Sequence, residues 1–170
     1  MDAGRTFIPD TTVYPSMDDP THAGIFARES PYLDSHVEIG VASGRVVSVR
    51  FPGTPDPESE ADHPLLDRVF AYLEGEKDTF DDVDVALSAA TADHAILEAV
   101  REIPYGEDSS VKQVARLAGV DPGDEAALNR VREALDENPA PIFVPDHRVR
   151  DGPSAAPPAI EQRVRSLEGL

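Results

Sequence analysis

The chain has 170 residues, a length that fits one ordinary domain or two small ones. It contains no cysteine, which excludes disulfides, thiolate metal ligands and thiol catalysis. No apolar run approaches the roughly 20 residues that a membrane span needs, and nothing resembles a signal peptide, so we expect a cytoplasmic protein.

The net charge of −18 is large for this length. Such acidity normally argues against a polyanionic partner. At roughly 1 M salt, however, the Debye length is about 3 Å, so distant carboxylates barely repel DNA phosphates. We therefore interpret the acidic composition as that of a halophilic protein. Residues 1–90 carry 18 acids and 6 bases (−12), whereas residues 91–170 carry 15 acids and 9 bases (−6). The second part is thus the less acidic one, as would be expected if it touches nucleic acid.

The first half of the chain predicts a small α/β domain over residues 23–88. Residues 1–22 are polar and lack periodicity, so we expect a disordered tail, with Met17 as an alternative start. Strands are predicted over residues 23–30 and 35–51, the second interrupted by a Ser43-Gly44 hairpin turn.

A helix over residues 64–73 follows an acidic, proline-rich loop, and Val83–Leu87 is predicted as one more short strand. The aspartates at positions 81, 82 and 84 suit a solvated face better than a metal site. The five histidines also lack the spacing of metal ligands, so neither a metal nor a cofactor is expected.

From Thr91 onward the pattern becomes helical, and Thr91 is itself a suitable N-cap for the first of these helices. Helices are predicted over residues 92–102, 111–118 and 125–137, with Ser110 as a cap of the second and Gly119 as its end. A helix followed by two helices joined by a tight turn is typical of a helix-turn-helix domain, here over residues 91–170. A last helix is predicted over residues 159–167.

The segment Asn138–Val149 is rich in proline and carries a short apolar run. Proline fixes φ and removes a backbone donor, so this segment cannot be the interior of a helix. We expect a rigid extended rod that presents Asp146, His147 and Arg148.

Four sequence matches, in register, resemble the O6-alkylguanine-DNA alkyltransferase family. They are Ile103-Pro-Tyr-Gly-Glu107, Val114-Ala115, Asn138-Pro139 and Pro145-Asp-His-Arg-Val149. The resemblance implies an α+β protein, with a ribonuclease-H-like N-terminal α/β domain and a C-terminal winged helix-turn-helix domain. It also implies binding in the DNA minor groove, where such proteins insert an arginine and rotate the damaged guanine out of the stack. A cysteine then takes the alkyl group, activated through water by a histidine that a glutamate orients.

This sequence departs from the family pattern at the acceptor itself. Asp146 stands where the family has the cysteine, while His147 and Arg148 are retained. Counted along the last helix, the orienting glutamate falls near Leu170, so it is expected to be missing unless a register shift brings Glu168 to its place.

Further departures fall on the DNA-facing positions. Val111 replaces a tyrosine that presses on a phosphate, and Asn129 replaces the inserted arginine. Arg132 and Glu133 replace small residues, and the glycine-rich pocket loop has become residues 152–158.

An aspartate at this position removes the soft sulfur nucleophile of the cysteine. The ordinary pKa of an aspartate is about 3.9, so it is ionised at neutral pH. A carboxylate can nevertheless displace at carbon and form an ester that water cleaves, so a dealkylase would leave an ester on Asp146 or release alkyl product. An Asp146–His147 hydrolase dyad is disfavoured, because neighbours in an extended segment point to opposite faces.

The resemblance assigns DNA-facing positions, which we predict as the binding set. Asn129 and Arg132 share one helix face, so Arg132 could reach a phosphate beside the lost arginine. The alternative is that Arg130 and Arg132 pair with nearby acids on the same helix. Tyr105 could likewise be only a turn residue packed on the core. The full set is Tyr105, Ser110, Asn129, Arg130, Arg132, Asn138 and Arg148.

The sequence therefore predicts a DNA-repair protein that recognises alkylated guanine in double-stranded DNA without transferring the alkyl group to itself. Asp146 and His147 would line the base pocket. We expect a monomer that passes the lesion to other repair proteins. The alternative is a non-catalytic helix-turn-helix interaction or regulatory protein that no longer flips bases.

Overall fold

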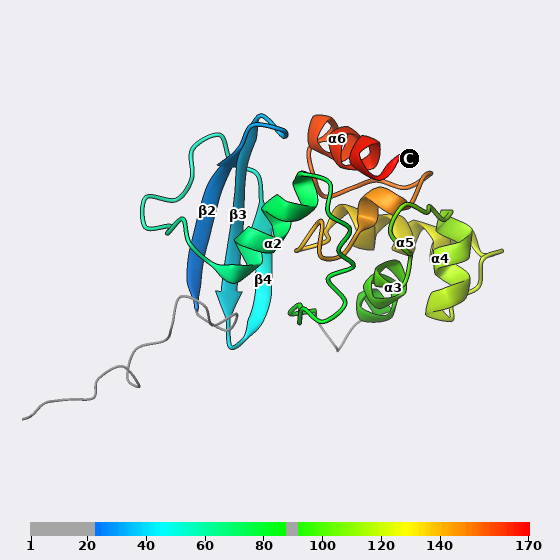
Figure 1. The fold of residues 1–170 in the computed structure, drawn as a ribbon. Helices are drawn as coiled ribbons and strands as arrows, with labels where there is room; N and C mark the ends of the chain where they lie inside the picture. The colour runs from blue at the N-terminus through cyan, green and yellow to red at the C-terminus, as the bar shows by residue number, and fades with distance from the viewer. Residues whose placement is uncertain (1–22, 88–91) are drawn as a thin grey trace, which may run out of the picture.

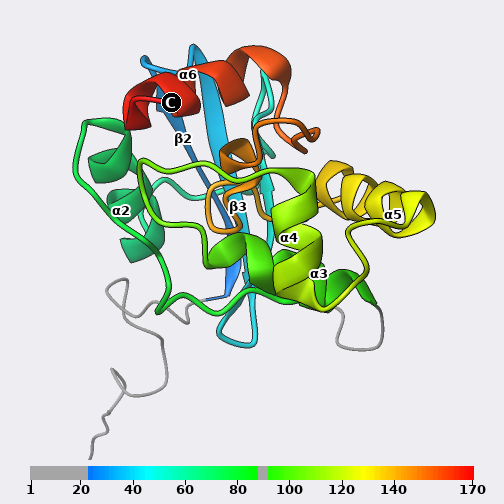
Figure 2. The same ribbon diagram turned by 90° about the vertical axis from the view of Figure 1, so that its right-hand side faces the viewer.

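A computed structural model describes residues 23–87 and 92–170. The expectations for residues 1–22 and for a cap at Thr91 lie outside these ranges. Within these ranges, three antiparallel strands and five α-helices form a mixed α/β fold (Figures 1 and 2). The elements are β2 (Gly24–Ser30), β3 (Ser35–Ala42), β4 (Arg45–Arg50), α2 (Pro64–Leu73), α3 (Ala92–Arg101), α4 (Val111–Ala118), α5 (Glu125–Asp136) and α6 (Pro158–Glu168).

The predicted hairpin is confirmed as β3 and β4, with Val41 opposite Val46. Ser43 and Gly44 both adopt positive φ, which matches the twist of the flanking strands. The sheet order is β2-β3-β4. The strand predicted over Val83–Leu87 is instead a single bridge between Val85 and Val46, because only the backbone around Val85 reaches the edge of β4.

The predicted helix bounds are confirmed for α2 and α4 and differ by one residue at the ends of the others. Pro64 occupies the first turn of α2, where a missing N–H costs nothing. Ser110 and Gln113 form a capping box at the start of α4, and Gly119 ends it with φ 81°. Helices α3, α4 and α5 pack against one another.

The rod expected over Asn138–Val149 is wrong in its conformation. The segment folds into tight turns, with φ 83° at Ile142, and then a 3₁₀ helix over Asp146–Arg148. Several of its backbone bonds are local, such as Val144 N to Ala140 O at 2.8 Å. The side-chain amide of Asn138 bonds two further backbone groups of the turn: it accepts from Ala140 N and donates to Val144 O. Prolines excluded a long helix here but not a short turn.

The two halves of the chain share a core and several direct contacts. Val49 N donates to Pro139 O at 2.9 Å, which ties β4 to the segment before Asp146. Tyr32 and Arg163 exchange hydrogen bonds between the β2–β3 turn and α6. No helix in the described part of the chain is long and apolar enough to cross a membrane.

Candidate functional site

Asp146 sits in the 3₁₀ helix with 1% of its surface exposed. Its Oδ1 accepts from Ser154 Oγ at 2.7 Å. Its Oδ2 accepts from Ala155 N at 2.9 Å and from Asn138 Nδ2 at 3.0 Å. Ser154 Oγ in turn accepts from Ala156 N. Residues 154–156 therefore fold directly onto the carboxyl group at the acceptor position.

Two opposing effects act on the Asp146 carboxyl. Burial raises its pKa, because a charge is costly away from water, while the hydrogen bonds from Ser154, Ala155 and Asn138 lower it. Burial is the stronger effect, so the pKa lies above its ordinary value.

The loop that closes over Asp146 is anchored at its start. A Cβ on Gly152 would lie 2.7 Å from Leu135 Cδ1 and 3.2 Å from Val111 Cγ2, so only glycine fits between these side chains. Asp151 Oδ1 accepts from Val111 N at 2.7 Å and so caps the first turn of α4. Val111, which replaces the family tyrosine, is buried under this loop rather than exposed to a phosphate.

Glu168 forms the centre of a second buried network. Its carboxylate accepts from His147 Nε2 at 2.8 Å, from Arg148 Nε at 2.8 Å and from Arg148 Nη2 at 2.9 Å. Gly106 N and the Tyr72 hydroxyl complete the set of donors. Burial alone would raise the pKa of Glu168, but the hydrogen bonds from His147 and Arg148 hold it well below its usual range. Burial and the neighbouring Glu168 carboxylate raise the pKa of Tyr72.

A glutamate in contact with His147 is therefore present at position 168, which corrects the absence expected from counting to Leu170. Glu168 extends the buried stripe of α6, which also contains Ile160 and Val164 at intervals of four residues. Leu170 lies beyond Gly169, which ends the helix. Counting along the helix misplaced the residue by two positions. The four-residue spacing from Ile160 would have identified it.

Two side chains predicted to contact DNA are instead buried. Arg148 is 3% exposed, and besides Glu168 it donates to Ile103 O at 2.7 Å. Asn138 is 4% exposed and holds the turn around Asp146. Because their polar groups already have partners, both residues stabilise the site from inside and are not available to a phosphate.

The other predicted DNA-facing residues lie nearer the surface. Tyr105 is half-buried and packs edge-on against Tyr72, with ring centroids 5.9 Å apart. Ser110 is occupied as the α4 cap. On α5, Arg132 Nη1 donates to Asn129 Oδ1 at 2.9 Å rather than to a neighbouring acid, and Arg130 is exposed.

Asp146 and His147 face different partners despite being neighbours in the chain. Asp146 turns to the loop over residues 154–156, whereas His147 turns to α6. Within the described ranges no hydrogen bond joins the two side chains, so the geometry offers no proton relay between them.

The aspartates at positions 81, 82 and 84 are all exposed, as expected for a solvated face, and only Asp82 of the three forms an ion pair with another described residue. Arg68 bonds both Asp78 and Asp82 with distances of 2.9 to 3.0 Å. No group of three or more metal-ligating side chains occurs in residues 23–87 and 92–170.

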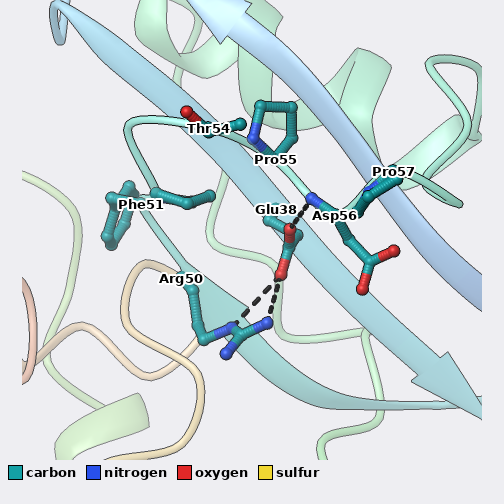
Figure 3. A pocket seen from close by; sticks show the side chains of 8 residues that line it. Glu38, Arg50, Phe51, Thr54, Pro55, Asp56 and Pro57 are labelled. Carbon is teal, nitrogen blue, oxygen red and sulfur yellow. Dashed lines mark hydrogen bonds and ion pairs between the residues drawn. The ribbon is translucent and has the colours of Figure 1, made fainter.

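A surface hollow of about 570 Å³ is lined by β3, β4 and the loop that follows β4 (Figure 3). Glu38 forms its floor, and its carboxylate accepts from Arg50 Nη2 at 2.6 Å and from Asp56 N at 3.0 Å. These bonds engage the Glu38 carboxylate from within the chain, so it is not an unoccupied catalytic group.

Comparison with known proteins agrees with the resemblance. Residues 91–156 match the family model "6-O-methylguanine DNA methyltransferase, DNA binding domain". A methylated-DNA–protein-cysteine methyltransferase of Methanopyrus kandleri is 33% identical over 131 residues, which are 72% of this chain and 93% of that protein. The inducible enzyme of that name from Bacillus subtilis is 35% identical over 101 residues, 59% of this chain and 54% of its own length.

Solved structures match over most of the chain. The Mycobacterium tuberculosis OGT in complex with DNA has a TM-score of 0.65 and 25% identity, covering 86% of this chain and 91% of its own. The O6-methylguanine-DNA methyltransferase of Pyrococcus kodakaraensis has a TM-score of 0.65 at 19% identity, covering 86% of this chain and all of its own, which shows the fold alone.

Proposed function

The chain belongs to the methylated-DNA–protein-cysteine methyltransferase family, and we propose that it recognises alkylated guanine in duplex DNA without accepting the alkyl group. In this proposal residues 91–170 act as a winged helix-turn-helix domain, and residues 23–88 as a ribonuclease-H-like domain that supports it. Other repair proteins would then process the marked lesion.

The observation that carries the proposal is the state of Asp146. A nucleophile needs a lone pair aimed at the carbon that it attacks, and an unhindered approach. Three donors already engage the Asp146 oxygens, and the side chain is almost fully enclosed. Carboxylates are also weak nucleophiles toward an alkyl carbon compared with a thiolate. The acceptor position thus holds a structural group.

The frame around that position supports lesion recognition. His147, Arg148 and Glu168 form a connected buried network, and Tyr72 joins it from α2. Such a network keeps the segment before the 152–158 loop in one conformation. A rigid base beneath a loop is what a pocket for a rotated base requires.

A second function is favoured by the closure of the loop. Admitting a base would release Ser154 and Ala155 from Asp146, and each bond to a charged group is worth roughly 1.5–3 kcal/mol. The total of about 3–6 kcal/mol corresponds to a factor of roughly 10² to 10⁴ in affinity. If contacts with the lesion do not offset this cost, the protein binds DNA as a scaffold and does not flip bases.

Binding to duplexes with and without one O6-methylguanine separates the two functions. The titrations should be run by fluorescence anisotropy in KCl from 0.1 to 2 M, because the acidic composition suggests a high-salt environment. We expect tighter binding to the lesion duplex. Equal affinities would support the scaffold, and no binding to either duplex would remove both proposals.

Mass spectrometry tests the loss of transfer. After incubation with the lesion duplex we expect an unchanged mass for the wild-type chain and no released alkyl product. Asp146→Cys should gain one methyl group, and Asp146→Ser is its matched control, equally small but without a thiol. An ester on Asp146 in the wild-type chain, or turnover of the lesion, would contradict the proposal.

A further inference from the structure

Most basic side chains of the described residues are already neutralised or bonded within the chain. Three arginines, at positions 101, 163 and 165, donate to backbone carbonyls. Five more form ion pairs with carboxylates: Arg28 with Asp67, Arg50 with Glu38, Arg68 with Asp78 and Asp82, Arg148 with Glu168, and Arg150 with Asp108. These eight side chains already have partners within the chain.

Helix α4 carries the largest positive charge of the described helices. It carries Lys112 and Arg116 and no acidic residue, a charge of +2. The other helices of the described chain are neutral or negative. The balance is zero in α2 (one acid, one base) and in α6 (two and two), and −1 in α3 (two and one) and α5 (three and two). Within a chain of net charge −18, this concentration of positive charge is local to one element.

The two cations share one exposed face of α4. Residues four apart lie one above the other on a helix, so Lys112 and Arg116 are neighbours. Both are exposed, and neither has a hydrogen bond or ion pair to any described residue. The opposite face, with Val111, Val114 and Ala115, is buried against α3 and α5, whose positions Figure 2 shows.

The helix is also held rigidly for its length. The Ser110–Gln113 capping box and the Asp151 carboxylate satisfy its first turn, and Gly119 closes its last. A fixed helix presents its charges to a partner with little loss of backbone entropy.

We propose that the exposed face of α4, through Lys112 and Arg116, is the main phosphate-contacting surface of this protein for duplex DNA. This inference rests on the proposed function. Charge complementarity selects α4 over α5, where Glu133 and Asp136 offset Arg130 and Arg132. In this chain the helix that precedes α5 thus supplies the charge that positions the protein on the backbone, and α5 carries little of it.

The salt dependence of binding to an undamaged duplex tests the proposal. Each phosphate contact contributes about 0.9 to the slope of log K against log salt concentration. We expect K112A/R116A to reduce this slope by about 1.8. The matched control is Arg45→Ala, which removes an exposed cation without an ion pair at the start of β4 and should leave the slope unchanged. The double variant R130A/R132A should change the slope by less than K112A/R116A.

The outcomes separate this inference from the proposed function. If the wild-type chain binds and K112A/R116A keeps the wild-type slope, the inference is overturned while DNA binding stands. A larger loss in R130A/R132A than in K112A/R116A overturns it as well. An equal loss with Arg45→Ala would mean that only net charge matters, which also contradicts it. If the wild-type chain binds no duplex, the proposed function itself fails. Circular dichroism should be unchanged in all variants, because every altered side chain lies at the surface.

Discussion

Replacing Glu168 by alanine tests the buried network most directly. In the wild-type chain the Arg148 guanidinium, with 4% of its side chain exposed, is paired with this carboxylate through two nitrogens. Glu168→Ala leaves Ile103 O as the remaining hydrogen-bond partner of the Arg148 side chain and removes the acceptor of His147 and Tyr72. Removing one partner of a buried ion pair typically costs about 3–5 kcal/mol, because the remaining charge is left uncompensated. Because Arg148, His147 and Tyr72 all lose the Glu168 carboxylate, we expect Glu168→Ala to lower the free energy of unfolding by an amount in this range.

The assay is equilibrium urea unfolding at constant KCl, followed by circular dichroism, with the free energy of unfolding extrapolated to water. Tyr72→Phe is the matched control, since it removes one hydroxyl from the same carboxylate and leaves the ion pair. A hydrogen bond to a charged group contributes roughly 1.5–3 kcal/mol, so this variant should lose less than Glu168→Ala. If Glu168→Ala costs no more than Tyr72→Phe, Arg148 is not an enclosed charge and the assignment of the network is refuted.

Two further predictions concern the loop and the acceptor position. Gly152→Ala should lower the free energy of unfolding by about 1–3 kcal/mol, because its Cβ would overlap Leu135, and an unchanged urea midpoint would show that the loop yields freely. Asp146→Asn should remove the contribution of this carboxyl to the pH dependence of the free energy of unfolding. Since burial raises the folded-state pKa of Asp146 above 3.8, its stabilising contribution is present below that pH and is lost as the pH rises through the raised pKa. The stability of Asp146→Asn relative to wild type should therefore increase from pH 4 toward neutrality, and parallel pH profiles would contradict this reasoning.

The sequence alone determined the elements whose signals are local. Alternating residues around Ser43-Gly44 specified the hairpin, and helical spacing with Ser110 and Gly119 specified the bounds of α4. Family membership was also predictable, because the family motifs are short runs of adjacent residues that can be recognised without knowing which residues are in contact. Each of these features depends on residues that lie close to one another in the sequence.

Only the tertiary structure decided how the site is built. Tyr72, Gly106 and His147 meet Glu168 from positions 96, 62 and 21 residues away in the chain. The closure of residues 154–156 onto Asp146, and the burial of Arg148, likewise follow from long-range packing. Residue types show which groups need partners, because a buried polar group must be hydrogen-bonded. Which partners they find depends on the fold that brings distant segments together, and that arrangement turned the acceptor position into an enclosed carboxyl and the expected missing glutamate into the centre of the network.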